Sequence, residues 1–428
     1  MPPSDSAPTI QSRVPAAGLT VYTLTSVRVT FAETVTGVAQ DALLINGSAT
    51  ATALSGTGAG PYTWTIPQPA DGTVNVELPS GTITDTPHGN PYGGATWSYN
   101  LDTSAPGVQT IVPGEGALVN ALTSISVTFN KRVANVSDDD LEVNGEAIAT
   151  LTPGGSGSGP YEWTFAQPAD GTVSCALLNG GIEDVGGNPF LGYTWDYTLD
   201  SAAPLVSVVS PVDGASVPAL TQVSVMFDEA VTGVVMSDLL VNGSATATGL
   251  SGADAGPYAF TIPEPAEGTA NLELQSGATV DLAGNPFVGG HTWSVDLDKT
   301  APTLASTVPA DGGVVRELTQ VEVTFDESVV NVAVGDLLVN GSATATGVTG
   351  TDAGPYVFTI PQPAEGGVTL TLNAGTPATQ DAAGNPYAGA DTWSVTLDGT
   401  APTAAVVAPV ADALVTGLTQ VEVTFDEA

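Results

Sequence analysis

Apolar and polar side chains alternate in short runs along the whole chain. In the clearest run, Val321, Val323 and Phe325 alternate with Glu322 and Thr324. A period of two residues places apolar groups on one face of an extended strand and polar groups on the other. The runs are rich in Val and Thr, whose β-branched side chains pack well on a pleated surface. This pattern predicts an all-β chain.

The stretch 299–398 contains the signals of a complete β-sandwich. Strands are predicted at 303–308, 318–325, 337–339, 356–360, 368–372 and 392–397, with turns marked by Gly, Pro, Asn and Asp between them. The dipeptide Asn340-Gly341 tolerates positive φ at both residues, so it predicts a tight hairpin turn. About seven short strands, with turn signals roughly every ten residues, are typical of a β-sandwich.

The same pattern recurs along the chain. The phenylalanine that ends the long strand stands at Phe31, Phe129, Phe227, Phe325 and Phe425, at spacings of 98, 98, 98 and 100 residues. A period of this length is one domain rather than one turn of a solenoid. We therefore expect four β-sandwiches, each with its own core, and the truncated start of a fifth, at 6–102, 103–200, 201–298, 299–398 and 399–428. We expect a piece of a longer chain with flanking domains.

The charge of the chain limits the classes of partner that it is expected to bind. Six Lys plus Arg stand against 45 Asp plus Glu, which gives a formal net charge of −39, yet charged residues make up only 12% of the chain. Because that share is about half the usual one, the imbalance is a shortage of bases. Without basic clusters we expect neither nucleic acid nor anionic lipid as a partner, whereas divalent cations suit the chain. No apolar run reaches the roughly 18 to 20 residues of a membrane-spanning helix, so we expect no membrane insertion in this segment.

Repeated positions of the aromatic residues favour core packing. Trp97, Trp195, Trp293 and Trp393 share one strand position, while Trp64 and Trp163 exchange with Phe260 and Phe358 at another. Exchange with Phe favours hydrophobic filling over sugar stacking. Cys175 stands where other copies have Val76 and Leu272, so we expect a small core residue and no intrachain disulfide. Aromatics after the Asn-Pro turns are expected to be exposed candidates for ligand contact, namely Tyr92, Phe190, Phe287 and Tyr387.

Acidic residues recur at three places in the repeat and are candidate calcium ligands. Asp-Glu pairs follow the long strand, Asp opens the Gly-Asn-Pro turn, and Asp stands between successive copies. Calcium takes six to eight oxygens, and turns rich in Asp, Asn and Gly supply carboxylates and free carbonyls. The candidate ligands are Asp228, Glu229, Asp281, Asp298, Asp326, Glu327, Asp381 and Asp398, with Asp102, Asp184, Asp200, Asp426 and Glu427 at matching positions.

A second interpretation of these acids needs no metal. Asp and Asn favour turns because their side chains bond to nearby backbone amides, and the chain has no match to the twelve-residue EF-hand loop. Both interpretations stay open at this point. The second copy departs from the pattern because Asn130-Lys131 replaces Asp-Glu, and the first has Ala32-Glu33. A role tied to the Asp-Glu pair is therefore weakest in these two copies.

The linkers between copies are short. Asp298-Lys299-Thr300-Ala301-Pro302 leaves almost no slack between the last strand of one copy and the first strand of the next. Proline fixes φ and biases the residue before it toward extended geometry. We expect successive copies to be held end to end with limited bending, so that four of them reach on the order of 130 Å.

The chain has few residues in an arrangement suited to catalysis. His88 and His291 are the only imidazoles, they occupy different positions in their copies, and neither has a recurrent Ser or Cys partner. Acid-base and nucleophilic catalysis need such partners within hydrogen-bond reach. We expect no enzyme activity.

Three features of the sequence resemble the bacterial immunoglobulin-like domains found in tandem in surface-layer, adhesin and large secreted proteins. They are the Ala-Pro opening at 301–309, the strand at 318–325, and Asp281-Leu282-Ala283-Gly284-Asn285-Pro286 before Trp293. The resemblance covers essentially the whole chain. It implies tandem immunoglobulin-like β-sandwiches in an extracellular or cell-surface protein. This fold serves spacing, adhesion and enzyme attachment alike.

We therefore expect a non-catalytic structural extension, a stalk or spacer, of a bacterial secreted or cell-surface protein, stiffened by calcium at its junctions. The competing hypothesis is an adhesive module whose turn loops bind a cell-surface glycan or protein, with avidity from repetition. Accessory domains beside a hydrolase are a third hypothesis, which the sequence does not separate from the first.

Overall fold

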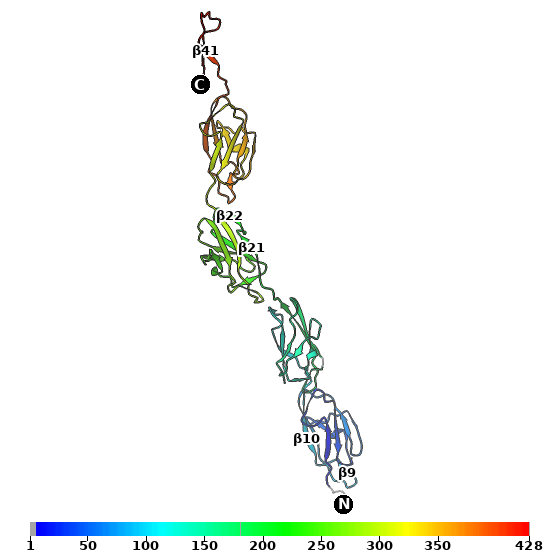
Figure 1. Cartoon of the computed structure of the whole chain (residues 1–428). Helices are drawn as coiled ribbons and strands as arrows, with labels where there is room; N and C mark the ends of the chain where they lie inside the picture. The colour runs from blue at the N-terminus through cyan, green and yellow to red at the C-terminus, as the bar shows by residue number, and fades with distance from the viewer. Residues whose placement is uncertain (1–5, 180, 428) are drawn as a thin grey trace. The chain divides into compact units, whose positions relative to one another are not determined.

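The computed structural model describes residues 6–179 and 181–427. Its contacts divide the chain into two compact units, Met1–Ala202 with Ala283–Asn285 (unit 1) and Ala203–Leu282 with Pro286–Ala428 (unit 2). Figure 1 shows the strands of each copy as a separate group. Ala428, the last residue of the predicted fifth copy, lies outside the described residues. The exact boundaries between copies remain a prediction.

Unit 1 contains the first two copies, each with two four-stranded sheets and a two-stranded ribbon. In spatial order, the sheets of the first copy are β1 (Ile10–Val14), β3 (Ser26–Phe31), β7 (Tyr62–Thr65), β6 (Ala53–Ser55), and β2 (Thr20–Val21), β10 (Ala95–Leu101), β8 (Gly72–Leu78), β5 (Leu44–Ile45). Those of the second copy are β11 (Val108–Val112), β13 (Ser124–Phe129), β17 (Tyr161–Thr164), β16 (Thr150–Leu151), and β12 (Leu118–Val119), β20 (Tyr193–Leu199), β18 (Gly171–Leu177), β15 (Leu141–Val143). The ribbons pair β4 (Val35–Thr36) with β9 (Thr84–Asp85) and β14 (Val133–Ala134) with β19 (Glu183–Asp184), and short 3-10 helices lie at η1 (Gln40–Ala42) and η2 (Asp138–Asp140).

Unit 2 contains the strands of the third and fourth copies, which are built in the same way. The sheets of the third copy are β21 (Val206–Ser210), β23 (Gln222–Phe227), β27 (Tyr258–Thr261), β26 (Gly249–Ser251), and β22 (Ala215–Val217), β30 (His291–Leu297), β28 (Gly268–Leu274), β25 (Leu239–Val241). Those of the fourth are β31 (Leu304–Val308), β33 (Gln320–Phe325), β37 (Tyr356–Thr359), β36 (Gly347–Thr349), and β32 (Val314–Val315), β40 (Asp391–Leu397), β38 (Gly366–Leu372), β35 (Leu337–Val339). The ribbons pair β24 (Val231–Thr232) with β29 (Val280–Asp281) and β34 (Val329–Val330) with β39 (Gln380–Asp381), and the 3-10 helices are η3 (Met236–Asp238) and η4 (Val334–Asp336).

The strand order is the same in all four copies. In the fourth copy, β33 pairs antiparallel with both β31 and β37, and β38 pairs antiparallel with both β35 and β40. Only the short β32 runs parallel to its partner, β40. Two sheets of this kind packed face to face form a β-sandwich. The predicted all-β sandwich fold is confirmed.

The alternation seen in the sequence is an alternation between core and solvent. Along β33, the side chains of Val321, Val323 and Phe325 are buried, whereas Glu322 and Thr324 are half-buried. Burying one such apolar side chain stabilises a fold by about 1.5–3 kcal/mol. Each of the four copies has a contiguous core of this kind, as predicted.

The structure has more strands than the seven predicted for each copy. Eight strands form the two sheets of a copy, and two more form its ribbon. Several of these, such as β32, β34 and β39, are only two residues long. A segment of two residues cannot display a period of two, so the sequence pattern carries no signal for it.

The predicted turn at Asn340 and Gly341 is confirmed. Their φ angles are 49° and 77°, and Val339 and Ser342 exchange two backbone hydrogen bonds of 2.9 and 3.0 Å across the turn. The hairpin does not continue, because β36 begins at Gly347 and pairs with β37 in the opposite sheet. The turn therefore redirects the chain from one sheet to the other.

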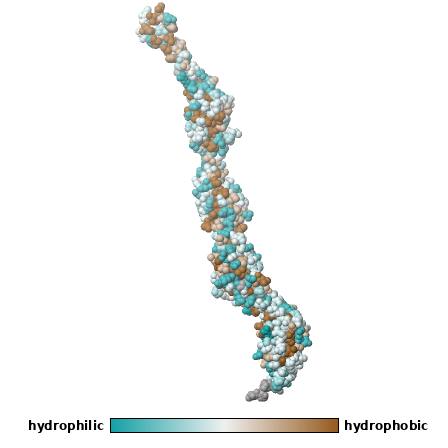
Figure 2. Space-filling model, turned by 90° about the vertical axis from the view of Figure 1, so that its right-hand side faces the viewer, coloured by the Kyte–Doolittle hydropathy of each residue, from teal (hydrophilic) through white to brown (hydrophobic). Residues whose placement is uncertain are grey.

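The last described segment pairs β41 (Ala404–Ala408) with β42 (Glu422–Phe425). The apolar side chains of Leu414, Leu418, Val421 and Phe425 are exposed, and apolar colour gathers at this end of the chain in Figure 2. A two-stranded pair is marginal by itself. Within the described residues no second sheet covers it.

Candidate metal centre at the junction of two copies

Three predicted ligands converge where the third copy ends and the fourth begins. Asp298 directly follows β30, Glu327 stands two residues after β33, and Asp381 ends β39. Each carboxylate offers one oxygen, and these three oxygens lie within 4.8 Å of one another. Oxygens bound to one calcium ion at 2.3–2.6 Å lie at most about 5 Å apart, so this spacing fits a single ion.

Asp381 is buried and held by the turn that follows it. The carboxylate Oδ1 accepts hydrogen bonds from the backbone N–H groups of Gly384 and Asn385 at 2.7 and 2.8 Å, and Oδ2 accepts one from Asn385 Nδ2 at 2.8 Å. These bonds fix the orientation of the carboxylate and use about three of its four lone-pair sites, so that Oδ2 retains one for a further partner. The metal-free turn chemistry predicted for this position is therefore present.

Asn385 ties this turn to the linker. Its Nδ2 also donates to the backbone carbonyl oxygen of Asp298 at 2.7 Å. Both hydrogens of one amide group are thus used, one on each side of the junction. The linker and the carboxylate of Asp381 are held as one group, which organises the site in advance of any ion.

The negative charges of nearby carboxylates affect the pKa of Glu327. Burial raises the pKa of Glu327 above its usual value, and the charges of Asp381, Asp298 and Asp326 raise it further. Like charges at close range disfavour ionisation, and a bound divalent cation reverses that effect. Asp326 itself binds Thr303, accepting hydrogen bonds from its backbone N–H at 2.7 Å and its hydroxyl at 2.6 Å, and these bonds lower the pKa of Asp326.

The predicted ligands of the third copy occupy equivalent places. Asp228 Oδ1 accepts a hydrogen bond from the backbone N–H of Leu205 at 2.7 Å, as Asp326 does from Thr303. The carboxylates of Glu229 and Asp281 have oxygens within 4.8 Å of each other. This copy therefore keeps the same pairing of a strand-end glutamate with a turn aspartate.

The junction after the fourth copy carries only part of the arrangement. Asp398 Oδ1 accepts a hydrogen bond from the Thr400 N–H at 3.3 Å, and Asp426 accepts bonds from the N–H and hydroxyl of Thr403. Burial raises the pKa of Glu427, and the charge of Asp398 raises it further. No turn aspartate completes a cluster with these acids among the described residues.

The second copy fills the same place with a lysine. Lys131 stands where the fourth copy has Glu327, and its Nζ lies 2.9 Å from Asp102 Oδ2 and 3.2 Å from Asp184 Oδ2. It also donates to the carbonyl oxygen of Ser104 at 2.7 Å. The sequence marked Lys131 as a departure from the repeat, but the contact was not predicted. Aligning the three positions across copies gives the signal that was missed.

Two family models match the unit 2 region of the chain. Each describes a bacterial Ig-like domain, and they match residues 200–296 and 298–396. Residues 200–396 form two tandem bacterial Ig-like domains. The Ig-like strand order of these domains recurs in both copies of unit 1.

The chain shares little sequence with the solved structures to which it is similar. No curated protein sequence matches the chain. Similar solved structures include the human desmocollin-1 ectodomain (10% identity, 92% of this chain and 79% of that chain, TM-score 0.23) and the S-layer protein rSbsC (15%, 94% and 56%, 0.20). A third is Bacteroides ovatus SGBP-B in complex with a mixed-linkage heptasaccharide (10%, 88% and 94%, 0.16).

The family assignment bears on location and activity at a coarse level. Bacterial Ig-like domains fit an extracellular or surface-located module with a structural or adhesive role, and such domain families are generally non-catalytic. Across the described residues, no helix combines the length and the apolar character that crossing a membrane requires.

The aromatics after the Asn-Pro turns belong to the cores of the Ig-like domains, so the prediction that they are exposed is wrong. Phe287 is 4% exposed and packs edge-on against Phe227, with ring centroids 5.4 Å apart and planes at 86°. The reason is the backbone: Phe287 N–H donates to the Thr279 carbonyl at 2.9 Å, which folds the segment back over the sandwich. The other copies show the same edge-on pairs, Phe31 with Tyr92, Phe129 with Phe190, and Phe325 with Tyr387.

The strand aromatics and the cysteine are buried as predicted. The eight strand residues are Trp97, Trp195, Trp293, Trp393, Trp64, Trp163, Phe260 and Phe358, none more than 9% exposed. Cys175 is a free, buried cysteine. Burial, and then the charge of Asp196, raise the pKa of its thiol to about 12. These side chains fill the cores of the Ig-like domains rather than a ligand site.

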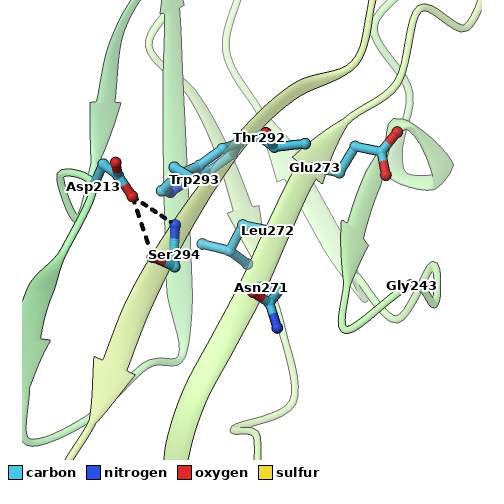
Figure 3. Close-up of a pocket in the computed structure, with 8 residues that line it drawn as sticks. All are labelled: Asp213, Gly243, Asn271, Leu272, Glu273, Thr292, Trp293 and Ser294. Carbon is cyan, nitrogen blue, oxygen red and sulfur yellow. Dashed lines mark hydrogen bonds between the residues drawn. The ribbon is translucent and has the colours of Figure 1, made fainter.

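A shallow hollow lies on the outer face of the third Ig-like domain (Figure 3). Its volume is about 410 Å³, and it is lined by Asp213, Gly243, Asn271, Leu272, Glu273, Thr292, Trp293 and Ser294. Asp213 accepts hydrogen bonds from the backbone N–H and the hydroxyl of Ser294 at 2.8 and 3.2 Å. Because the indole of Trp293 belongs to the core, the hollow offers polar groups but no aromatic platform. None of the predicted ligands lines it.

Proposed function

We propose that the chain is a non-catalytic structural extension of a bacterial secreted or cell-surface protein, in which calcium at the junctions limits bending between Ig-like domains. The convergence of Asp298, Glu327 and Asp381 carries this proposal. Asp298 lies before the linker, whereas Glu327 and Asp381 belong to the following copy. An ion bound by both sides of a short linker opposes its bending, because bending breaks metal-oxygen bonds.

The residues at this junction fit calcium. Each of the three carboxylates offers one oxygen to the cluster, calcium takes six to eight oxygens, and water supplies the remainder. Asp298 and Glu327 are half-buried and Asp381 is buried. The buried carboxylate is therefore held in place by the protein, while the two half-buried carboxylates can be reached by an ion from solvent. The ligands are hard oxygen donors without Cys or His, which favours calcium over zinc.

The competing adhesive function loses the contacts that were predicted for it. The four turn aromatics, Tyr92, Phe190, Phe287 and Tyr387, are each at most 4% exposed. Binding hot spots are usually large aromatic or Arg side chains that a partner can reach. The spacer function is therefore favoured.

Calorimetric titration of the full chain with calcium, after dialysis against EDTA, tests the proposal. We expect heat of binding and a higher melting temperature, since calcium at about 100 times its Kd stabilises the folded state by about 2.7 kcal/mol. Glu327→Gln is expected to lower the number of ions bound per chain by one. Glu317→Gln, an exposed residue of the same copy, is the matched control and should leave the number unchanged. A chain that neither binds calcium nor changes its melting temperature contradicts the proposal.

A further inference from the structure

We propose that Lys131 is a built-in cation that takes the place of the divalent ion, so that the junction between the first and second copies is closed without metal. The contrast with the junction at Asp298 rests on the proposed function. The closure by Lys131 rests on the contacts of its own ammonium group.

The ammonium of Lys131 is surrounded by oxygens from both sides of the linker. Nζ lies 3.1 and 2.9 Å from the two carboxylate oxygens of Asp102, and 2.7 and 2.9 Å from the carbonyl and hydroxyl oxygens of Ser104. A fifth oxygen, Asp184 Oδ2, lies at 3.2 Å. Asp184 is only 3% exposed at its side chain. Five oxygens from three residues around one nitrogen resemble a coordination shell.

The frame around Lys131 is the frame of the candidate calcium site. Asn188 Nδ2 donates to Asp184 Oδ2 at 3.0 Å and to the Asp102 carbonyl at 2.6 Å, as Asn385 does to its own partners. Asn130 Oδ1 accepts the backbone N–H of Gly107 at 3.0 Å, which replaces the bond that Asp228 and Asp326 make in the third and fourth copies. The exchange of a glutamate for Lys131 is thus the main chemical change at this junction.

The two junctions carry the same formal charge when one calcium ion is included at the junction of Asp298. Asp298, Glu327 and Asp381 are three carboxylates of formal charge −3, and a calcium ion brings that cluster to −1. Asp102 and Asp184 with Lys131 also carry a formal charge of −1. The lysine therefore supplies within the chain what the other junction obtains from solution. A chelator is then expected to loosen the junction at Asp298 and to leave the junction at Lys131 unchanged.

A calcium titration of the full-length Lys131→Glu variant tests the inference by creating a site. The variant is expected to bind one more calcium ion per chain than the unaltered protein. Arg132→Glu makes the same change of charge at the exposed neighbouring residue and is expected to add none. If Lys131→Glu gains no ion, or if Arg132→Glu gains one as well, the inference is overturned.

Hydrogen exchange of the full chain in EDTA gives a readout that does not depend on calcium binding. Amides of residues 103–105 and 107 are expected to exchange equally with calcium and with EDTA, and Lys131→Met should accelerate them about tenfold or more. Linker exchange that speeds up in EDTA without any substitution, or that ignores Lys131→Met, overturns the inference. If the unaltered chain binds no calcium while Lys131→Glu binds one, the proposed function fails and the assignment of Lys131 stands.

Discussion

The side-chain amide of Asn385 donates a hydrogen bond to the Asp298 carbonyl oxygen at 2.7 Å and another to Asp381 Oδ2 at 2.8 Å. In unit 1, Asn188 makes the corresponding bond to the Asp102 carbonyl oxygen at 2.6 Å. In both places a neutral group anchors the linker to the turn of the following copy. The proposed cation, calcium at one junction and the ammonium of Lys131 at the other, would act on a frame that is already assembled.

Asn385→Ala is expected to destabilise the fourth copy by about 1–3 kcal/mol, because the Asp298 carbonyl and the Asp381 carboxylate lose a donor at a partly buried site. Hydrogen exchange of β39 and β40 in the full chain measures this, with the third copy as an internal reference. Asn373→Ala, at a half-buried position in the same copy, is the control and should change stability by less than about 0.5 kcal/mol. Equal effects of the two variants contradict the anchoring role.

Phe287→Ala is expected to cost the third copy about 3–5 kcal/mol, since removing a core ring leaves a cavity beside Phe227. Phe287→Tyr should cost much less, because tyrosine stands at this position as Tyr92 and Tyr387 in two other copies. Hydrogen exchange of β23 amides reports the loss. If both variants exchange like the unaltered chain, the ring is not part of the core.

Cys175 is expected to resist thiol reagents at pH 8 while the chain is folded. Burial raises its pKa to about 12, so the thiolate is roughly one part in ten thousand at pH 8. The rate of labelling by a disulfide reagent should rise by several orders of magnitude in denaturant. Ser251→Cys, at an exposed position on β26, provides a second thiol that should react at once. Equal labelling rates at the two cysteines would show that the reagent reaches the core of the second copy in the folded chain.

The strands that carry a period of two were predictable because each buries one face against the opposite sheet. Val321, Val323 and Phe325 show this along β33. The two-residue strands were not predictable, because their pairing comes from tertiary contacts. Tyr387 was misjudged for a related reason. It follows a Gly-Asn-Pro turn, whose composition indicates a loop, while its burial depends on the Thr379 carbonyl that binds its N–H at 2.8 Å.

The candidate site was predictable in composition but not in geometry. The repeat marks Asp298, Glu327 and Asp381 as acids at turns and strand ends, yet their approach to within 4.8 Å requires the fold. The contacts of Lys131 were not predicted because it lies 29 and 53 residues from its two carboxylate partners. Only the fold brings Lys131 close to these two carboxylates.

The Lys131 junction is expected to loosen at acid pH. Hydrogen bonds from Ser104 and then Lys131 lower the pKa of Asp102. Burial opposes the same effect at Asp184, but bonds from its turn and from Lys131 still lower its pKa. A carboxyl with a folded pKa below its unfolded value of 3.8 stabilises the fold above that pH, and the contribution is lost as pH falls through the folded value.

Hydrogen exchange of the linker amides in EDTA, corrected for intrinsic rates, measures this pH dependence. Protection should be constant near neutral pH and fall below about pH 4. Lys131→Met should make the fall smaller, because one of the contacts that lower both pKa values is gone. A fall of the same size in the variant contradicts the role given to the ammonium.

Small-angle scattering of the full chain, in calcium and then in EDTA, tests calcium stiffening most directly. With calcium, the maximum dimension should reach or exceed the order of 130 Å expected for four copies held end to end. With EDTA, junctions that lack a lysine should bend more freely, and both the maximum dimension and the radius of gyration should fall. The same values in both solutions contradict the claim that calcium limits bending between the Ig-like domains.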